Sequence, residues 1–391
     1  MTSLDPSHPL SAGLTADSRL VRSYQGERQE VVPVWFMRQA GRSLPEYREL
    51  RVGTRMLDAC LEPAMASEIT LQPVRRHGVD AGIFFSDIVV PLKLAGVAVE
   101  IQPGRGPVFE QPVRTASDVA RLEEVDPASL DAATFAPIAE AVRLTTAELG
   151  STPLIGFAGA PFTLAAYLVE GGPSKDHIRA RTMMHADPQT WARLMAWSAD
   201  VTGAFLRAQL LAGASAAQLF DSWAGSLSLR DYVEHVAPAS ARALSHVRDL
   251  TYEVARPEAP EAEAVEPTDA GATPVIDEPL VRNVPIVHFG VGTGELLNAM
   301  HDVGADTVGV DYRTPLDEAA RRLGHVVPVQ GNVDPAMLDA PWEVLSAHVV
   351  DVLKRGREAP AHVLNLGHGV PPETDPTVLT RVVELVHGWR P

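Results

Sequence analysis

The sequence predicts an α/β fold of parallel strands, most simply a (β/α)8 barrel. Eight short apolar runs alternate with stretches in which apolar residues recur every three or four positions, which is the spacing of helices. A polar or glycine-rich cluster follows nearly every run. Eight strand–helix repeats are the number that closes a barrel. An open doubly wound sheet would show the same alternation, so the count alone leaves closure undecided.

The eight runs are expected to be strands because each is short and apolar, as buried parallel strands are. In chain order they read Val-Pro-Val-Trp-Phe-Met (32–37), Val-Asp-Ala-Gly-Ile-Phe-Phe (79–85), Pro-Leu-Ile-Gly-Phe-Ala (153–158), Ala-Ser-Ala-Ala-Gln-Leu-Phe (214–220), Val-Pro-Ile-Val-His-Phe (284–289), Ala-Asp-Thr-Val-Gly-Val (305–310), Val-Val-Pro-Val-Gln (326–330) and His-Val-Leu-Asn-Leu (362–366). Between them the spacing predicts helices, for example over 188–212, which opens on a proline, and over 293–304, which closes on a glycine.

The clusters that follow the runs carry residues able to bind or react. In a barrel the carboxyl ends of all strands meet at one face, where such enzymes keep their active sites. In chain order the clusters are Arg38 to Arg42, Ser86-Asp87, Gly159 to Pro161, Asp221-Ser222, Gly290 to Gly294, Asp311, Gly331-Asn332 and Gly367 to Gly369. We therefore expect a functional site at this face.

Composition narrows the class of protein. The 391 residues are 46% hydrophobic and 21% charged, an ordinary globular profile. No apolar run reaches the length of a transmembrane helix, and residues 1–15 are polar and proline-bearing, which predicts a flexible N-terminus without a secretory signal. The single cysteine, Cys60, allows no intrachain disulfide and no multi-thiolate metal site. A cytoplasmic location fits best.

The charge balance excludes a nucleic-acid partner. The chain has 33 basic and 50 acidic residues, hence a net charge of −17, whereas nucleic-acid binding needs a basic surface. Residues 255–279 hold five prolines and seven acids, so we expect a solvated or disordered acidic insert there. Any anion site must be made locally, by a few cations gathered against the overall charge.

Arg38 and Arg42 are the leading candidates for such a site. They follow the first apolar run at a spacing of four, and arginine is rarely placed at the end of a core element without an anionic partner. One interpretation is a pair that bridges acidic side chains of the protein. The other is a fork that grips ligand carboxylates bidentately, which arginine does better than lysine.

Four further side chains have both a functional and a purely structural interpretation. Asp87 either caps the next helix or faces a cavity, where its carboxylate would accept N–H bonds or stabilise a cation. Tyr167 sits at core-facing spacing in an expected helix, although its phenol could point inward. Ser222 is as well placed for a turn as for a ligand. His368 lies between two glycines, and no His-Glu-x-x-His or Cys/His cluster predicts a metal site.

A rival signal is the glycine-rich turn Gly290-Val-Gly-Thr-Gly294 with Asp311 after the next strand. A strand, a glycine-rich turn, a helix and a later acid describe a nucleotide or S-adenosylmethionine site. The last glycine comes one position early for Gly-x-Gly-x-x-Gly, and the turn lies in the middle of a longer series of units. A nucleotide-binding α/β enzyme therefore stays an alternative.

Several motifs together resemble the uroporphyrinogen decarboxylase family. They extend over nearly the whole chain, and the set is far more specific than any one motif. The matching motifs are Pro33-Val-Trp-Phe-Met-Arg-Gln-Ala-Gly-Arg42, Gly156-Phe-Ala-Gly-Ala-Pro161, Phe220-Asp-Ser-Trp-Ala-Gly225, Gln330-Gly-Asn-Val-Asp-Pro335 and Asn365-Leu-Gly-His-Gly369.

The resemblance implies one distorted (β/α)8 barrel of the TIM type over residues 1–391, a homodimer, and a reaction without cofactor or metal. The implied activity decarboxylates the four acetate arms of uroporphyrinogen III, giving coproporphyrinogen III. Asp87 would accept the pyrrole N–H groups, and Arg38 is the candidate proton donor. The residues expected to contact the substrate are Arg38, Gln39, Ala40, Gly41, Arg42, Asp87, Tyr167, Ser222 and His368. Ser43 departs from the tyrosine that the family often has there. A porphyrin carrier without catalysis is a third alternative.

Overall fold

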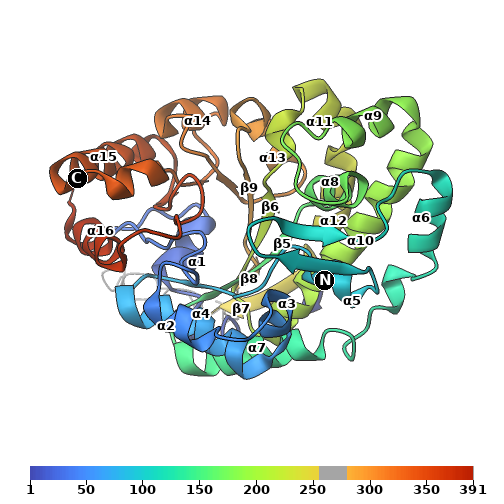
Figure 1. Ribbon diagram of the computed structural model, residues 1–391. Helices are drawn as coiled ribbons and strands as arrows, with labels where there is room; N and C mark the ends of the chain where they lie inside the picture. The colour runs from blue at the N-terminus through green and yellow to red at the C-terminus, as the bar shows by residue number, and fades with distance from the viewer. Residues whose placement is uncertain (255–279, 391) are drawn as a thin grey trace, which may run out of the picture.

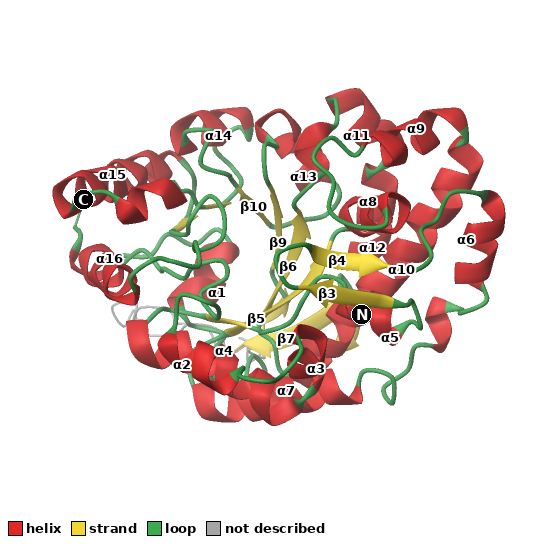
Figure 2. Cartoon of the chain, viewed as in Figure 1, coloured by secondary structure: helices red, strands yellow, loops and turns green. Residues whose placement is uncertain are grey.

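The computed structural model describes residues 1–254 and 280–390, and its centre is a seven-stranded parallel sheet (Figures 1 and 2). Each of the last seven expected runs contributes one strand. The order across the sheet is β12 (His362–Val363), β11 (Val329–Gln330), β10 (Thr307–Gly309), β9 (Ile286–Gly290), β6 (Ala216–Asp221), β5 (Leu154–Gly159) and β2 (Gly82–Ile83). The predicted α/β class and the parallel arrangement are confirmed.

The sheet is strongly curled. Gln330 on β11 donates a hydrogen bond of 3.0 Å from Nε2 to Oε1 of Gln218 on β6, although β9 and β10 lie between these strands. Both glutamines are fully buried. Side chains on strands that are separated by two other strands meet in this way only when a sheet bends round on itself, as in barrels. Tyr24 and Trp35 extend the same buried chain of hydrogen bonds.

The first expected run forms an isolated bridge instead of a strand. Val34 pairs in parallel with Leu364, just beyond β12, and on its other side the carbonyl of Val34 accepts from the N–H of Asp80 at 2.8 Å. Pro33 has no N–H to donate, which shortens the ladder. The N–H of Val34 donates to the side chain of Asp80 at 2.8 Å. Backbone hydrogen bonds thus join the 33–35 segment to β12 on one side and to the chain before β2 on the other.

Helices cover the outside of the sheet (Figure 1). Helices α14 to α16 lie on one side of the strands, and α8 to α12 lie on the other. The helices are α1 (Arg19–Tyr24), α2 (Pro45–Leu50), α3 (Met56–Leu61), α4 (Pro63–His77), α5 (Val90–Leu94), α6 (Ala116–Glu123), α7 (Ala136–Leu149), α8 (Pro161–Glu170), α9 (Ile178–Ala186), α10 (Pro188–Ala212), α11 (Leu229–His235), α12 (Ala237–Ser245), α13 (Leu297–Asp302), α14 (Leu316–Arg322), α15 (Trp342–Arg355) and α16 (Pro376–Gly388). No helix among the described residues is long and apolar enough to cross a membrane.

Local sequence sets the bounds of the longest helix. In α10 the side chain of Asp187 accepts from the N–H of Thr190 and Pro188 opens the first turn, where a missing N–H costs nothing. Gly213 ends the helix at φ 133°. The expected helix 188–212 is confirmed residue for residue, whereas 293–304 is broken into the 3-10 turn η3 (Gly294–Leu296) and α13.

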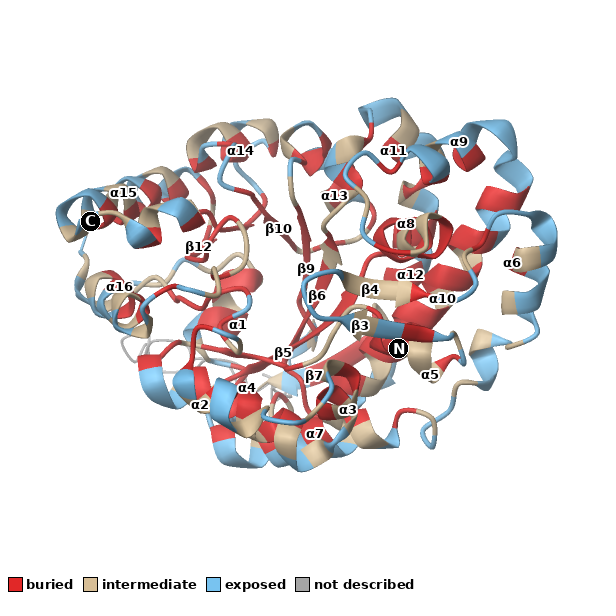
Figure 3. Cartoon of the chain, in the orientation of Figure 1, coloured by how far each residue is buried: buried red, intermediate tan, exposed pale blue. Residues whose placement is uncertain are grey.

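The strands of the seven-stranded sheet are largely buried (Figure 3). Two other small sheets accompany them: the antiparallel hairpin of β3 (Val99–Gln102) and β4 (Gly106–Phe109), and a three-stranded sheet with the order β1 (Thr2–Ser3), β7 (Leu250–Val254), β8 (Leu280–Asn283). The remaining short 3-10 turns are η1 (Pro127–Ser129), η2 (Ala224–Ser226), η4 (Pro335–Asp339) and η5 (Gly356–Glu358).

Residues 1–15, which the sequence predicts to be flexible, make contacts with the rest of the fold. Thr2 donates its N–H to the carbonyl of Asp249 at 2.7 Å, and Leu4 does the same to Thr251 at 2.8 Å. Leu10 is fully buried. A polar composition did not reveal these contacts, because strand addition uses backbone groups and only a few apolar side chains.

The expected insert at 255–279 lies outside the described residues, but its two ends are neighbours. Val254 on β7 and Leu280 on β8 are register partners in an antiparallel pair. A two-residue Asn-Gly turn suits such a pair. We expect the chain with 255–279 replaced by Asn-Gly to keep its Tm within about 3 °C, because no described core residue is lost and loop closure changes little. A thermal melt checks this, and a large drop in Tm would mean that the insert supports the fold.

Candidate active site

The residues expected to be functional gather at the carboxyl-terminal edge of the curled sheet. Arg38 follows the bridge at Val34, Asp87 follows β2, Tyr167 lies on the helix after β5, Ser222 follows β6 and His368 follows β12. The strands are parallel, so these positions share one end of the sheet.

The loop that carries Arg38 is held from below by buried side chains. Asn365 accepts the N–H of Met37 at 2.9 Å through Oδ1. Gln39 is fully buried, accepts the N–H of Phe36 at 2.9 Å and donates to the carbonyl of Ala81 at 3.0 Å. The Gln39 side chain therefore braces the loop and does not reach out toward a ligand.

Arg38 itself adopts an unusual backbone conformation. Its φ is 60°, the left-handed region that non-glycine residues enter at a cost and that often marks functional positions. Its side chain lies against Gly369, where an added Cβ would stand 2.4 Å from Cδ of Arg38. A glycine at 369 thus provides the space in which the Arg38 side chain lies.

Arg38, Asp87 and Tyr167 share one electrostatic environment. Burial raises the pKa of Asp87, while an N–H bond from Val89 at 3.1 Å and the charge of Arg38 oppose that rise. Burial raises the pKa of Tyr167 to about 12, with Asp87 adding to the shift and Arg38 opposing it. Asp87 is not the cap of α5, whose N-cap is Val89; its carboxylate accepts the N–H of Val89 in the turn before the helix and is influenced by the charge of Arg38.

His368 lies near the same arginine. Burial lowers the pKa of His368, and the positive charges of Arg38 and Arg313 lower it further, with Asp311 opposing them. The neutral imidazole is thus favoured at physiological pH, when His368 would act as a hydrogen-bonding group.

A cavity of about 540 Å³ opens beside these residues. Ser222 lines it, together with His177, Trp223 and Arg313. Tyr167 stacks on Trp223 with ring centroids 3.8 Å apart, and His177 lies on the other side at 4.2 Å from Trp223. The stack connects the cavity to the Arg38 group, because Trp223 lines the cavity and Tyr167, which stacks on it, lies in the electrostatic environment of Arg38.

The sequence did not single out the cations and aromatics of this cavity. Lys175, Arg181 and Arg313 line it together with one acid, Asp176, so cations outnumber carboxylates there in a chain of net charge −17. Trp223 directly follows Ser222, so its position after an expected strand was the one available signal. Arg313 follows Asp311 in the same way. Lys175 and Arg181 lie between strands, where strand-end reasoning gives no signal.

The structure does not favour the rival glycine-rich turn as a phosphate site. Asp311 is 2% exposed and accepts the N–H of Gly292 at 2.7 Å, so the protein's own carboxylate occupies that donor. Asp311 also pairs with Arg313. A phosphate loop needs its N–H groups free.

Arg38 and Arg42 have no carboxylate of the described residues within 4.0 Å. The interpretation as a salt bridge within the protein therefore finds no partner in that part of the chain. Both are exposed, and Arg42 lies near Tyr47, whose pKa is raised by burial and lowered by Arg51 and by Arg42. No described contact joins Arg42 to Asp87.

Ser43 is buried, with an Oγ that has no hydrogen-bond partner among the described residues. The nearby aromatic side chain is Tyr47, which packs against Phe85 with ring centroids 5.9 Å apart. An aromatic group thus stands beside the arginine loop despite the serine at 43.

The fold and the site together define a class of protein. A curled parallel sheet with a cation-lined cavity, a partly buried carboxylate and stacked aromatics at its carboxyl edge is typical of a barrel-type α/β enzyme for a polyanionic ligand. The profile of the family described as uroporphyrinogen decarboxylase matches residues 15–389. This chain belongs to that family.

Curated relatives agree over the full length. A uroporphyrinogen decarboxylase of Leifsonia xyli subsp. xyli is 79% identical over 100% of this chain and 99% of that protein. One from Arthrobacter sp. (strain FB24) is 63% identical over 97% and 99%. One from Tropheryma whipplei (strain Twist) is 50% identical over 98% and 94%.

A solved structure shares the fold at low sequence identity. It is a methyltransferase from Methanosarcina mazei, 17% identical, with a TM-score of 0.72 over 95% of this chain and 98% of that chain. At this identity the similarity shows the fold alone.

Proposed function

We propose that this protein is a uroporphyrinogen decarboxylase that converts the four acetate arms of uroporphyrinogen III to methyl groups, giving coproporphyrinogen III in haem and porphyrin biosynthesis. Membership of the family supports the activity. The observation that carries the site is the convergence of Arg38, Asp87 and Tyr167 at the strand ends. A substrate with carboxylates at its rim and N–H groups at its centre matches cations around a carboxylate.

Each residue has a role in this proposal. The Asp87 carboxylate accepts the pyrrole N–H groups, and Arg38 and Arg42 grip carboxylates at the rim. The N–H groups of Ala40 and Gly41 donate no hydrogen bond within the described part of the chain, which leaves them free for a substrate carboxylate. Further contacts to the acetate and propionate arms are assigned to Tyr167, Ser222 and His368.

Gln39 enters the proposal through its backbone. Its side chain is engaged with Phe36 and Ala81, so it holds the Arg38 loop in place. The test of this positioning role is Gln39→Glu, which cannot donate to Ala81 and should lower Tm along with activity.

The chemistry requires a sink for the electron pair that the departing carbon dioxide leaves behind. Protonation of a ring carbon makes the pyrrole a cation, and the electrons of the broken C–C bond then move into the ring as an exocyclic double bond forms. The exocyclic carbon next takes a proton and the ring carbon releases one, so each cycle consumes one proton. No cofactor is needed in this scheme. Asp87 stabilises the ring cation through its negative charge.

In this proposal, Arg38 donates the proton that enters the ring. A guanidinium holds its proton tightly, so its larger contribution is to keep Asp87 ionised and to orient the acetate. The charge of Arg38 does lower the pKa of Asp87.

A single barrel domain, a homodimer and a cytoplasmic location form part of the same proposal. The hydrogen bonds that link residues 33–35 to β12 and to Asp80 support a single distorted barrel domain. We further propose a homodimer, as the family resemblance implies, which light scattering of the purified protein would test. A cytoplasmic location suits a chain whose one thiol, Cys60, is buried and free.

The direct test is an anaerobic assay of the purified protein with uroporphyrinogen III and no added cofactor. Heptacarboxylate intermediates should appear first and the tetracarboxylate product last. Binding of the porphyrinogen without release of carbon dioxide would instead identify a carrier. A Tm that rises with NAD or S-adenosylmethionine but not with the porphyrinogen would favour a nucleotide-binding protein.

Arg313 should contribute to substrate affinity. We expect Arg313→Ala to raise KM by about tenfold with a smaller change in kcat, because one charge-assisted contact to a carboxylate is lost. Steady-state kinetics measure both parameters. Arg143→Ala is the matched control, since Arg143 is 60% exposed and, in the described part of the chain, its one ion pair is with Glu140 on the same helix, α7, which precedes β5. Equal KM values for the two variants would remove Arg313 from the site.

A further inference from the structure

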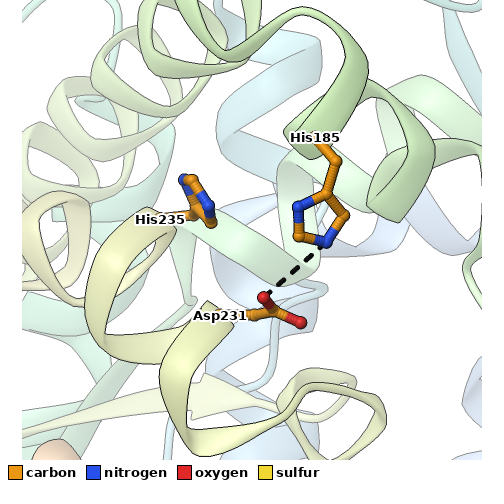
Figure 4. Close-up of side chains that lie close together, drawn as sticks. All are labelled: His185, Asp231 and His235. Carbon is orange, nitrogen blue, oxygen red and sulfur yellow. Dashed lines mark ion pairs between the residues drawn. The ribbon is translucent and has the colours of Figure 1, made fainter.

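Three metal-binding side chains meet on the surface at the ends of two helices (Figure 4). His185 lies in the last turn of α9, while Asp231 and His235 lie on α11. A spacing of four places Asp231 and His235 on the same face of their helix, one turn apart. Figure 4 shows the three side chains turned toward a common space.

The distances suit a shared ion. Nε2 of His185 is 3.6 Å from Oδ1 of Asp231, and one ligand atom from each of the three residues lies within 4.8 Å of the others. Two ligands bonded at 2.0–2.2 Å to a tetrahedral ion stand about 3.4 Å apart. The His185 side chain is 54% exposed, so rotation of its ring closes the remaining gap without disturbing the core.

The ligand atoms are available. Among the described residues, the only acid within 4.0 Å of a ring nitrogen of His185 or His235, other than Asp231, is the exposed Glu234, at 3.8 Å from His235. The N–H of Asp231 donates to Ser228, which fixes the backbone beneath its carboxylate and leaves the carboxylate free. The carbonyl of His235 accepts from Trp191 at 3.1 Å, so α11 is held at that end.

The electrostatics favour a cation at this point. Both histidines lie in last helical turns, where the helix dipole is negative. Glu234 adds a nearby negative charge, partly balanced by Arg230 at 3.4 Å.

We propose that His185, Asp231 and His235 form a site for one borderline divalent transition metal, such as Zn²⁺ or Co²⁺, with water completing a tetrahedron. Two imidazoles and one carboxylate suit these ions, whereas Mg²⁺ and Ca²⁺ prefer oxygen ligands alone. The bound ion ties the end of α9 to the end of α11.

The site is peripheral to the proposed active site. Helix α9 begins beside His177, and α11 begins just after the 222–226 segment, so both helices meet the cavity at their first turns. None of the three ligands lines the cavity: His185 and His235 lie in the last turns of their helices, and Asp231 lies in the first turn of α11. The ion therefore acts on stability and leaves the catalytic groups untouched.

Titration with Co²⁺, followed by visible absorption, tests the site directly. The full chain should bind one ion with the absorption of tetrahedral Co²⁺, and Zn²⁺ should displace it and raise Tm. His185→Ala and Asp231→Asn should each weaken binding by at least about 10- to 100-fold while keeping decarboxylase activity in the absence of metal. The His185 side chain is 54% exposed, and Asp231→Asn keeps the size of a side chain that is 19% exposed, so we expect both variants to fold.

His301→Ala is the matched control. His301 is also an exposed histidine, 38% exposed and 3.5 Å from Asp302, but it lies on another helix. The His301→Ala variant should bind Co²⁺ as tightly as the parent chain does. The proposal fails if the parent chain gives no saturable tetrahedral signal, if His185→Ala and His301→Ala bind equally, or if Mg²⁺ raises Tm as much as Zn²⁺.

Discussion

Replacing Asp87 with asparagine is expected to lower kcat by about 100- to 1,000-fold while the fold stays intact. The variant keeps the size of the side chain but removes the negative charge that would stabilise the pyrrole cation. Because the amide still fills the space beside Arg38 and Tyr167, substrate affinity should change far less than turnover. Single-turnover kinetics with the porphyrinogen separate the two effects. A kcat within a factor of about three of the parent would remove Asp87 from the mechanism.

The same substitution should not reduce stability at neutral pH. Burial raises the pKa of Asp87 above the value of about 3.9 found in an unfolded chain. The folded state therefore binds this proton more tightly than the unfolded state, so stability is lost as pH rises from about 4 through the folded pKa. At neutral pH the buried charge is a cost that asparagine avoids. The Tm of Asp87→Asn should equal or exceed that of the parent, with the difference vanishing below about pH 4.

Asp131→Asn is the control with the opposite sign. Hydrogen bonds from the N–H and hydroxyl of Thr134 lower the pKa of the exposed Asp131. Its contribution to stability is present above the unfolded pKa and is lost as pH falls, so the variant should lose Tm slightly at neutral pH and retain activity. A lower Tm for Asp87→Asn at neutral pH would show that the Asp87 charge is stabilised in the fold, contrary to this account.

Replacing Arg38 with alanine is expected to lower kcat/KM by about 100-fold. The loss combines a charged contact to a substrate carboxylate with the support that Arg38 gives to the ionised Asp87. Arg38→Lys should lose about tenfold, because the ammonium keeps the charge but not the bidentate fork.

The pH profile distinguishes these two contributions. The positive charge of Arg38 lowers the pKa of Asp87, so its removal raises that pKa. Activity needs the carboxylate, and the acidic limb of the kcat/KM profile should therefore move to higher pH in Arg38→Ala and stay in place in Arg38→Lys. Arg42→Ala is the matched control, since Arg42 has no described influence on Asp87 and should lose affinity without moving that limb. A limb unchanged in Arg38→Ala would separate Arg38 from Asp87.

Much of the fold could be predicted from local patterns in the sequence. The run 153–158 became Leu154–Gly159, and the caps at Asp187 and Gly213 set the bounds of α10. These features depend on residues close in sequence, so propensity and spacing suffice. The first run was predicted as a strand and forms only a bridge at Val34, because Pro33 lacks an N–H and the Asp80 side chain takes the place of a strand partner.

The candidate site was predictable in part. Arg38, Asp87 and His368 were predicted because each follows an expected strand. In the structure, the charge of Arg38 lowers the pKa of both Asp87 and His368. The same reasoning missed Lys175 and Arg181, because their segment enters the cavity from between two strands.

By itself, the sequence determined the α/β alternation, the polar clusters after the strands and the motifs that carry the family resemblance. The tertiary structure decided which of these residues face one another. The curl that joins Gln218 to Gln330, the left-handed backbone of Arg38 beside Gly369 and the meeting of His185 with Asp231 all connect residues distant in the chain. Such contacts depend on how the whole sheet closes and how helices pack around it, which no local pattern encodes.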